Sequence, residues 1–103
     1  MPNTAGNVAN KMLSRFVEQG GAQGKRNYFG FAGNADDGVS VLRANGKKYD
    51  VKREFIVQAV EAVRKDPAIY NAGPTRLKPY INRWIYSPLW AMLHLMTLDE
   101  ICS

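Results

Sequence analysis

The dipeptide Asn45-Gly46 constrains the fold of this 103-residue chain more than any other short stretch. Strand-like runs flank it, and Asn-Gly supplies the two positive-φ positions of a two-residue type I′ hairpin loop. Such a loop fixes a register, because the side chains of a strand alternate between its faces. The predicted pairs are Ala44 with Lys47, Arg43 with Lys48, Leu42 with Tyr49, Val41 with Asp50 and Ser40 with Val51. Leu42, Tyr49 and Val51 are then expected on the core face, with Arg43 beside Lys48 on the other.

A second turn signal, "NADDG" at residues 34–38, lies between the runs "RNYFGFAG" and "VSVLR". Gly and Asp cluster in hairpin loops, and aromatic and β-branched residues favour strands. The sequence therefore predicts a three-stranded antiparallel meander over residues 27–32, 39–44 and 47–51. In a regular strand Phe29 and Phe31 share a face. A core position for both is favoured over a platform on which bases stack, since large aromatic side chains are mostly buried.

Helical periodicity flanks the meander on both sides. Residues 7–19 place apolar side chains on one face, and Gly20 and Gly21 follow where a left-handed cap favours glycine. From Asp50 or Val51 to Lys65 or Asp66 the apolar positions again repeat every three to four residues. Pro67 ends this second helix, because the residue before a proline is disfavoured in the α region.

The C-terminal third begins with "DPAIYNAGPT", which predicts a long loop over residues 66–75. A helix is expected next, with Pro79 as its first residue and its apolar stripe formed by Leu77, Tyr80, Ile81, Trp84 and Ile85. A further helix is expected after Ser87 as the cap and Pro88 as the first residue.

Together these segments predict an α+β fold: an N-terminal helix, a three-stranded antiparallel meander, and two or three C-terminal helices packed on one sheet face. The length suits a single globular domain over residues 1–103, with a flexible N-terminus at 1–6. Cys102 is the single cysteine, so no internal disulfide forms, and the first residues lack the apolar run of a secretory signal. We expect a cytoplasmic protein.

Positive charge is concentrated around the second hairpin. The formal net charge is +5, and the eleven residues 43–53 hold five basic side chains against one acid. Two like charges opposite each other cost a few tenths of a kcal/mol on the ~0.2–1 kcal/mol scale of cross-strand pairs. A bound phosphate would reverse the sign of that effect, whereas cations on an edge strand also prevent sheet-to-sheet aggregation. Both explanations remain open.

No constellation of catalytic residues is evident. "NADDG" lacks the ligand spacing of a calcium loop, because Ala44 stands where the final glutamate belongs. His94 has no neighbouring acid or second histidine and is expected to be buried and hydrogen-bonded to the backbone. Cys102 has no adjacent base. We expect a protein that is not an enzyme and needs no metal or other cofactor.

The C-terminal segment is almost entirely uncharged. Residues 84–98 carry no charge, but Ser87-Pro88 interrupts them and the run is shorter than the ~20 residues that span a bilayer, so no membrane segment is expected. Arg76, Lys78 and Arg83 alternate with Tyr80, Trp84 and Tyr86, as in a nucleic-acid groove, although helical spacing assigns Tyr80 and Trp84 to the core. The side chains expected at an interface are Tyr86, Trp90, Met92, Leu95 and Met96.

Two functions follow from these patterns. The first is a small, basic, non-catalytic module that binds DNA or RNA phosphates through the hairpin and the helix start. Its expected contacts are Arg43, Lys47, Lys48, Lys52 and Arg53, with Lys25 and Arg26 on the neighbouring strand. The alternative is a protein-interaction or oligomeric accessory protein, of the kind that mobile elements also encode, whose uncharged C-terminal helix forms a homodimer or docks on a larger protein.

Overall fold

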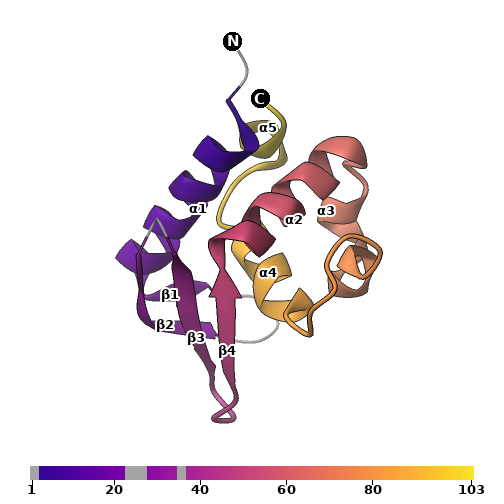
Figure 1. Ribbon diagram of the computed structural model, residues 1–103. Helices are drawn as coiled ribbons and strands as arrows, with labels where there is room; N and C mark the ends of the chain where they lie inside the picture. Colours follow the sequence, from indigo (N-terminus) through magenta and orange to yellow (C-terminus); the bar gives the residue numbers. More distant parts are fainter. Residues whose placement is uncertain (1–2, 23–27, 35–36) are drawn as a thin grey trace.

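A computed structural model describes residues 3–22, 28–34 and 37–103, and for residues 31–34 it describes the backbone alone. The elements in chain order are α1 (Ala5–Gln19), β1 (Gly21–Ala22), β2 (Tyr28–Asn34), β3 (Gly38–Arg43), β4 (Lys48–Lys52), α2 (Arg53–Lys65), α3 (Ile69–Ala72), the 3₁₀-helix η1 (Pro74–Leu77), α4 (Tyr86–Leu93) and α5 (Leu98–Cys102) (Figure 1). The predicted α+β architecture is confirmed.

The strands form one antiparallel sheet in the order β1-β2-β3-β4. Its last three strands are the predicted meander, and β1 adds a short strand at the edge of β2. Val39, Val41 and Val51 are buried on one sheet face, which α1, α2 and α4 cover (Figure 1). On the opposite face of β2, Phe29 is 48% exposed, so the core position predicted for it is wrong. The backbone register shifts between Gly30 and Ala32, and the side chain of Phe31 lies outside the described residues.

Helix α1 starts earlier than the periodicity predicted. The Thr4 hydroxyl accepts a hydrogen bond from the Asn7 N–H (3.1 Å) and caps the helix. Gly20 ends it with φ 73°, in the left-handed conformation expected there. The Asn3 N–H donates to the Ser103 carbonyl (3.0 Å), so part of the N-terminus predicted to be flexible is bonded to the other end of the chain.

Helix α2 begins at Arg53, immediately after β4, and ends at Lys65 as predicted. Its start falls later than the predicted Asp50 or Val51, because residues as far as Lys52 are paired with β3. The segment 66–75, predicted as a long loop, contains α3 and the start of η1.

The helix predicted from Pro79 to Ile85 is absent: residues 78–85 form turns and irregular backbone. Leu77, Ile81 and Ile85 are buried at the spacing that suggested the helix, whereas Tyr80 and Trp84 point outward, 40% and 81% exposed. Side chains spaced four residues apart can therefore all be buried by irregular backbone, without a helix. Helix α4 starts at Tyr86 and includes Ser87 and Pro88 in its first turn. The N–H groups of a first turn have no partner within the helix, so a proline there removes no hydrogen bond.

The short helix α5 was not expected from the sequence, although its start carries a clear signal. Thr97 and Glu100 form a reciprocal capping box, in which each side chain accepts from the other residue's backbone N–H. Arg64 of α2 donates to the carbonyls of Ile101 (2.6 Å) and Ser103 (3.2 Å). The Tyr70 hydroxyl donates to the Met96 carbonyl (2.6 Å). These contacts hold the C-terminus against the helical layer.

Candidate nucleic-acid interface

The loop of the β3–β4 hairpin has three residues rather than the predicted two. Arg43 and Lys47 close it, with the Arg43 N–H donating to the Lys47 carbonyl (2.8 Å) and the Gly46 N–H to the Arg43 carbonyl (2.8 Å). Gly46 has φ 88°, and no described residue other than glycine has positive φ, so Asn45 does not adopt the conformation that a type I′ turn needs. A turn followed by a left-handed glycine is the usual three-residue hairpin loop.

The extra loop residue moves the register by one position. Leu42 pairs with Lys48, Val41 with Tyr49, Ser40 with Asp50 and Val39 with Val51. The predicted register is wrong because it would place Ser40 toward the helices. The observed one buries Val39, Val41 and Val51 together.

The new register separates the predicted phosphate contacts. Arg43 lies across from Lys47 at the end of the hairpin, on the side of the sheet that carries Val41 and Tyr49. Lys48 lies on the opposite face beside Leu42, and exposed Lys52 is at the far end of β4. The predicted side-by-side pair Arg43 and Lys48 is therefore replaced by the pair Arg43 and Lys47.

Arg53, the next predicted contact, is bonded to helix α1. Its Nε donates to Asn10 Oδ1 (2.8 Å) and its Nη2 to the Gly6 carbonyl (3.3 Å). This guanidinium therefore joins two helices. Lys25 and Arg26, which were also predicted to contact phosphate, lie outside the described residues.

A hollow of about 200 Å³ opens beside the hairpin end. Its lining combines two cations with three aromatic rings and the first turn of α4: Arg43, Lys47, Tyr49, Trp84, Tyr86, Ser87 and Pro88. The irregular backbone of residues 78–85 brings Trp84 here. The helical spacing assigned Trp84 to the core, and that prediction is wrong because this segment forms no helix. Pro79 and Pro88, which bracket the segment closely, were the available signal against a long helix.

The aromatic rings and cations of this hollow contact one another. The Trp84 and Tyr86 rings meet edge to face with centroids 6.1 Å apart. Lys47 Nζ lies 5.3 Å from the centroid of the Tyr49 ring, and Lys78 Nζ lies 5.7 Å from that of Trp84. Such cation–π contacts hold ammonium groups near the rings without neutralising their charge. We call this group of residues (Arg43, Lys47, Tyr49, Lys78, Trp84 and Tyr86) the basic aromatic surface.

Few acids reach these cations. Among the described residues, no side-chain hydrogen bond or ion pair involves the Arg43 guanidinium or the Lys47 ammonium. Elsewhere Arg15 is paired with Glu100, and Arg53 and Arg64 donate to amide and carbonyl oxygens. Arg15, Arg53 and Arg64 thus bind groups of the protein itself and stabilise the fold. The cations at the hairpin end are available to an anion.

Other sequence-predicted residues have different surroundings. His94 is exposed, which corrects the expected burial, although its Nδ1 lies 2.9 Å from the Trp90 carbonyl as a backbone contact requires. Its ring lies between those of Tyr70 and Trp90, with both centroid distances 4.2 Å. Cys102 is exposed. Within the described ranges, no group of three His, Cys, Asp or Glu residues could hold a metal ion.

The predicted protein interface is partly buried in the chain's own core. Met92 and Met96 are 0% and 3% exposed, while Tyr86, Trp90 and Leu95 are half-buried and packed against the core. The methionines therefore offer no surface to a second copy. The part of the chain that the structure describes contains no helix long and apolar enough to cross a membrane.

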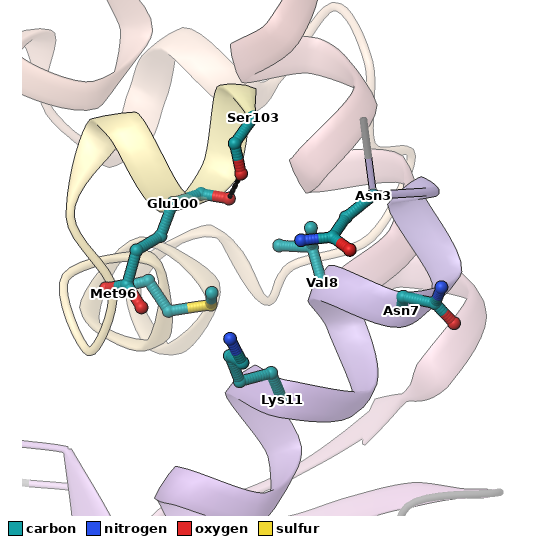
Figure 2. A pocket seen from close by; sticks show the side chains of 7 residues that line it. All are labelled: Asn3, Asn7, Val8, Lys11, Met96, Glu100 and Ser103. Atoms are coloured by element: carbon teal, nitrogen blue, oxygen red, sulfur yellow. Dashed lines mark hydrogen bonds between the residues drawn. The ribbon is translucent and has the colours of Figure 1, made fainter. Parts of the chain in front are cut away.

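A second hollow of about 270 Å³ lies between α1 and α5 near both chain ends. Figure 2 shows Lys11 and Asn3 directed into it, with Asn7 pointing away. The Glu100 carboxylate on its wall is already bonded to Arg15 and Thr97. With a single cation and no aromatic ring in its lining, this hollow has less to offer a polyanion than the hairpin end.

Comparison with protein-family models, with curated proteins and with solved structures found no match to this chain. The function is therefore argued from the residues themselves.

Proposed function

We propose that this chain is a small non-catalytic nucleic-acid-binding domain whose main contact is the basic aromatic surface at the end of the β3–β4 hairpin. One observation carries the proposal: Arg43 and Lys47 stand across from each other, without an acidic partner among the described residues, in a hollow lined by aromatic rings. Like charges so placed oppose folding slightly, and a phosphate between them converts the repulsion into attraction.

The position of the surface supports this proposal. Figure 1 shows the hairpin projecting at the end of the molecule opposite the two termini, where a long polymer can approach it. A formal net charge of +5 favours association with any polyanion, and Lys48 and Lys52 extend positive charge along β4. The lone exposed cysteine agrees with action in the reducing cytoplasm.

The test compares two double variants that remove the same charge. R43E/K47E reverses the hairpin cations, and K11E/K65E reverses exposed lysines on α1 and at the end of α2. Affinity for fluorescently labelled single- and double-stranded DNA and RNA is measured by anisotropy between about 50 and 300 mM salt, a range over which phosphate contacts weaken steeply.

Wild-type affinity should fall steeply with salt, and R43E/K47E should weaken binding by about tenfold or more and reduce the logarithmic salt slope by about two. K11E/K65E should retain most of the affinity. Equal losses in both variants would show that net charge alone attracts the polymer, and salt-independent or absent binding would refute the proposal.

A further inference from the structure

We infer that the basic aromatic surface takes single-stranded nucleic acid, with a base stacked on Trp84 and the neighbouring phosphates held by Arg43 and Lys47. The inference rests on the proposed function and narrows it to one class of polymer. Single-strand binders combine a positively charged groove with exposed aromatic side chains. Both components meet in this hollow, although the two cations and Trp84 lie about forty residues apart in the sequence.

The exposure of Trp84 is the first argument. Its side chain is 81% exposed, while most of the large apolar side chains in the described residues are buried. Exposing an indole ring to water to this extent costs free energy unless a partner covers it, because the transfer of apolar surface out of water is favourable. Tyr86 contacts it edge to face and Lys78 lies near its ring. These contacts restrict the indole without covering it.

The chemistry of the two polymers is the second argument. In a duplex the base faces are stacked on one another, and only base edges and phosphates are accessible in the grooves. A two-stranded ribbon such as β3–β4 can enter the major groove by itself. The aromatic rings of Trp84 and Tyr86 beside it would then find no base face. A single strand exposes both phosphates and base faces, and so uses every part of the surface.

The charge arrangement agrees with this occupant. Arg43 and Lys47 share the hollow with Trp84 and Tyr86, so a backbone phosphate on the cations brings its own base close to the rings. Arginine offers a planar fork to a phosphate, and lysine a compact point charge. The contact reads no particular base, because every base has a π-face.

The experiment measures affinity for a poly-dT single strand and a mixed-sequence duplex of equal length. W84A removes the indole, W84F keeps an aromatic ring, and F29A removes another exposed aromatic, on the opposite sheet face, as a matched control. The W90F variant leaves Trp84 as the sole tryptophan, so quenching of its fluorescence reports directly on stacking. Urea unfolding midpoints of all variants verify that each is folded.

W84A should weaken single-strand binding by about tenfold, the typical loss for one stacked base, while W84F and F29A stay within about threefold of the wild type. W90F should be quenched by poly-dT. Duplex affinity equal to or above single-strand affinity, or unchanged binding in W84A, would overturn this inference and leave the proposed function standing. If neither polymer binds in a salt-dependent way, the proposed function itself fails.

Discussion

At the scale of single residues, the ion pair between Arg15 and Glu100 ties α1 to the C-terminal helix. The guanidinium donates to both carboxylate oxygens, with Nη1 2.9 Å from Oε1 and Nη2 2.5 Å from Oε2, and also to the Leu95 carbonyl (2.9 Å). The Arg15 hydrogen bonds, followed by the backbone N–H of Thr97, lower the pKa of Glu100 to about 2. The same hydrogen bonds, to the Glu100 carboxylate, raise the pKa of Arg15.

This arrangement predicts acid sensitivity. A carboxyl whose pKa is lower in the folded state stabilises that state above its ordinary pKa of 4.5, and the stabilisation is lost as pH falls toward about 2. The urea unfolding midpoint of the wild type should therefore fall between about pH 4.5 and 2 more steeply than that of E100Q. Glutamine keeps the capping oxygen, removes the charge, and replaces the oxygen that accepts from Arg15 Nη2 with an amide NH2 that cannot accept.

The matched control is E61Q, which changes an exposed glutamate on α2. It should follow the wild-type pH profile. An E100Q profile that parallels the wild type over the same pH range would show that the ion pair contributes nothing measurable to stability.

At the scale of the elements, helix α1 lies directly on strand β2 because Gly30 has no side chain. A Cβ at this position would lie 2.6 Å from Cε1 of the buried Phe16 ring. The glycine therefore sets the distance between the helix and the sheet. Pairing of Gly30 with Val41 places this contact on the covered face.

We predict that G30A destabilises the protein by about 1–3 kcal/mol, as overpacking of a tight core does. Urea unfolding followed by circular dichroism gives the value. S40A, on the outer face of the adjacent strand, is the control and should change the free energy of unfolding by less than about 0.5 kcal/mol. A G30A midpoint equal to the wild type would mean that Phe16 moves aside without cost.

At the scale of the whole molecule, Arg53 joins the start of α2 to α1 and so links two of the helices that cover the sheet. Its sequence neighbour Lys52 is exposed at the end of β4. We predict that R53A lowers the free energy of unfolding by about 1.5–3 kcal/mol, the usual value of hydrogen bonds to a charged group, whereas K52A has little effect. Denaturant titration of both variants tests this.

The two substitutions remove the same charge, so their effects on nucleic-acid binding separate stability from contact. R53A should bind about as well as K52A under conditions where both are folded. A selective loss of affinity in R53A would return Arg53 to the contact surface and contradict the structural role assigned to it.

The sequence determined the order of helices and strands, because hydrophobic periodicity and glycine and proline positions act locally. It predicted α1, the three main strands and α2 to within a few residues. It also located the basic hairpin, from Asn45-Gly46 and from the cations around that turn. These features depend on neighbours along the chain, which the sequence displays directly.

Only the tertiary structure decided the hairpin register and the surroundings of Trp84. A two-residue and a three-residue loop are both compatible with Asn45-Gly46, and the choice depends on which side chains the helices bury: Val39 and Val41 rather than Ser40. Likewise Leu77, Ile81 and Ile85 are buried without a helix, which turns Trp84 outward beside Arg43 and Lys47. Burial is a property of elements packed together, so local periodicity could not reveal the basic aromatic surface.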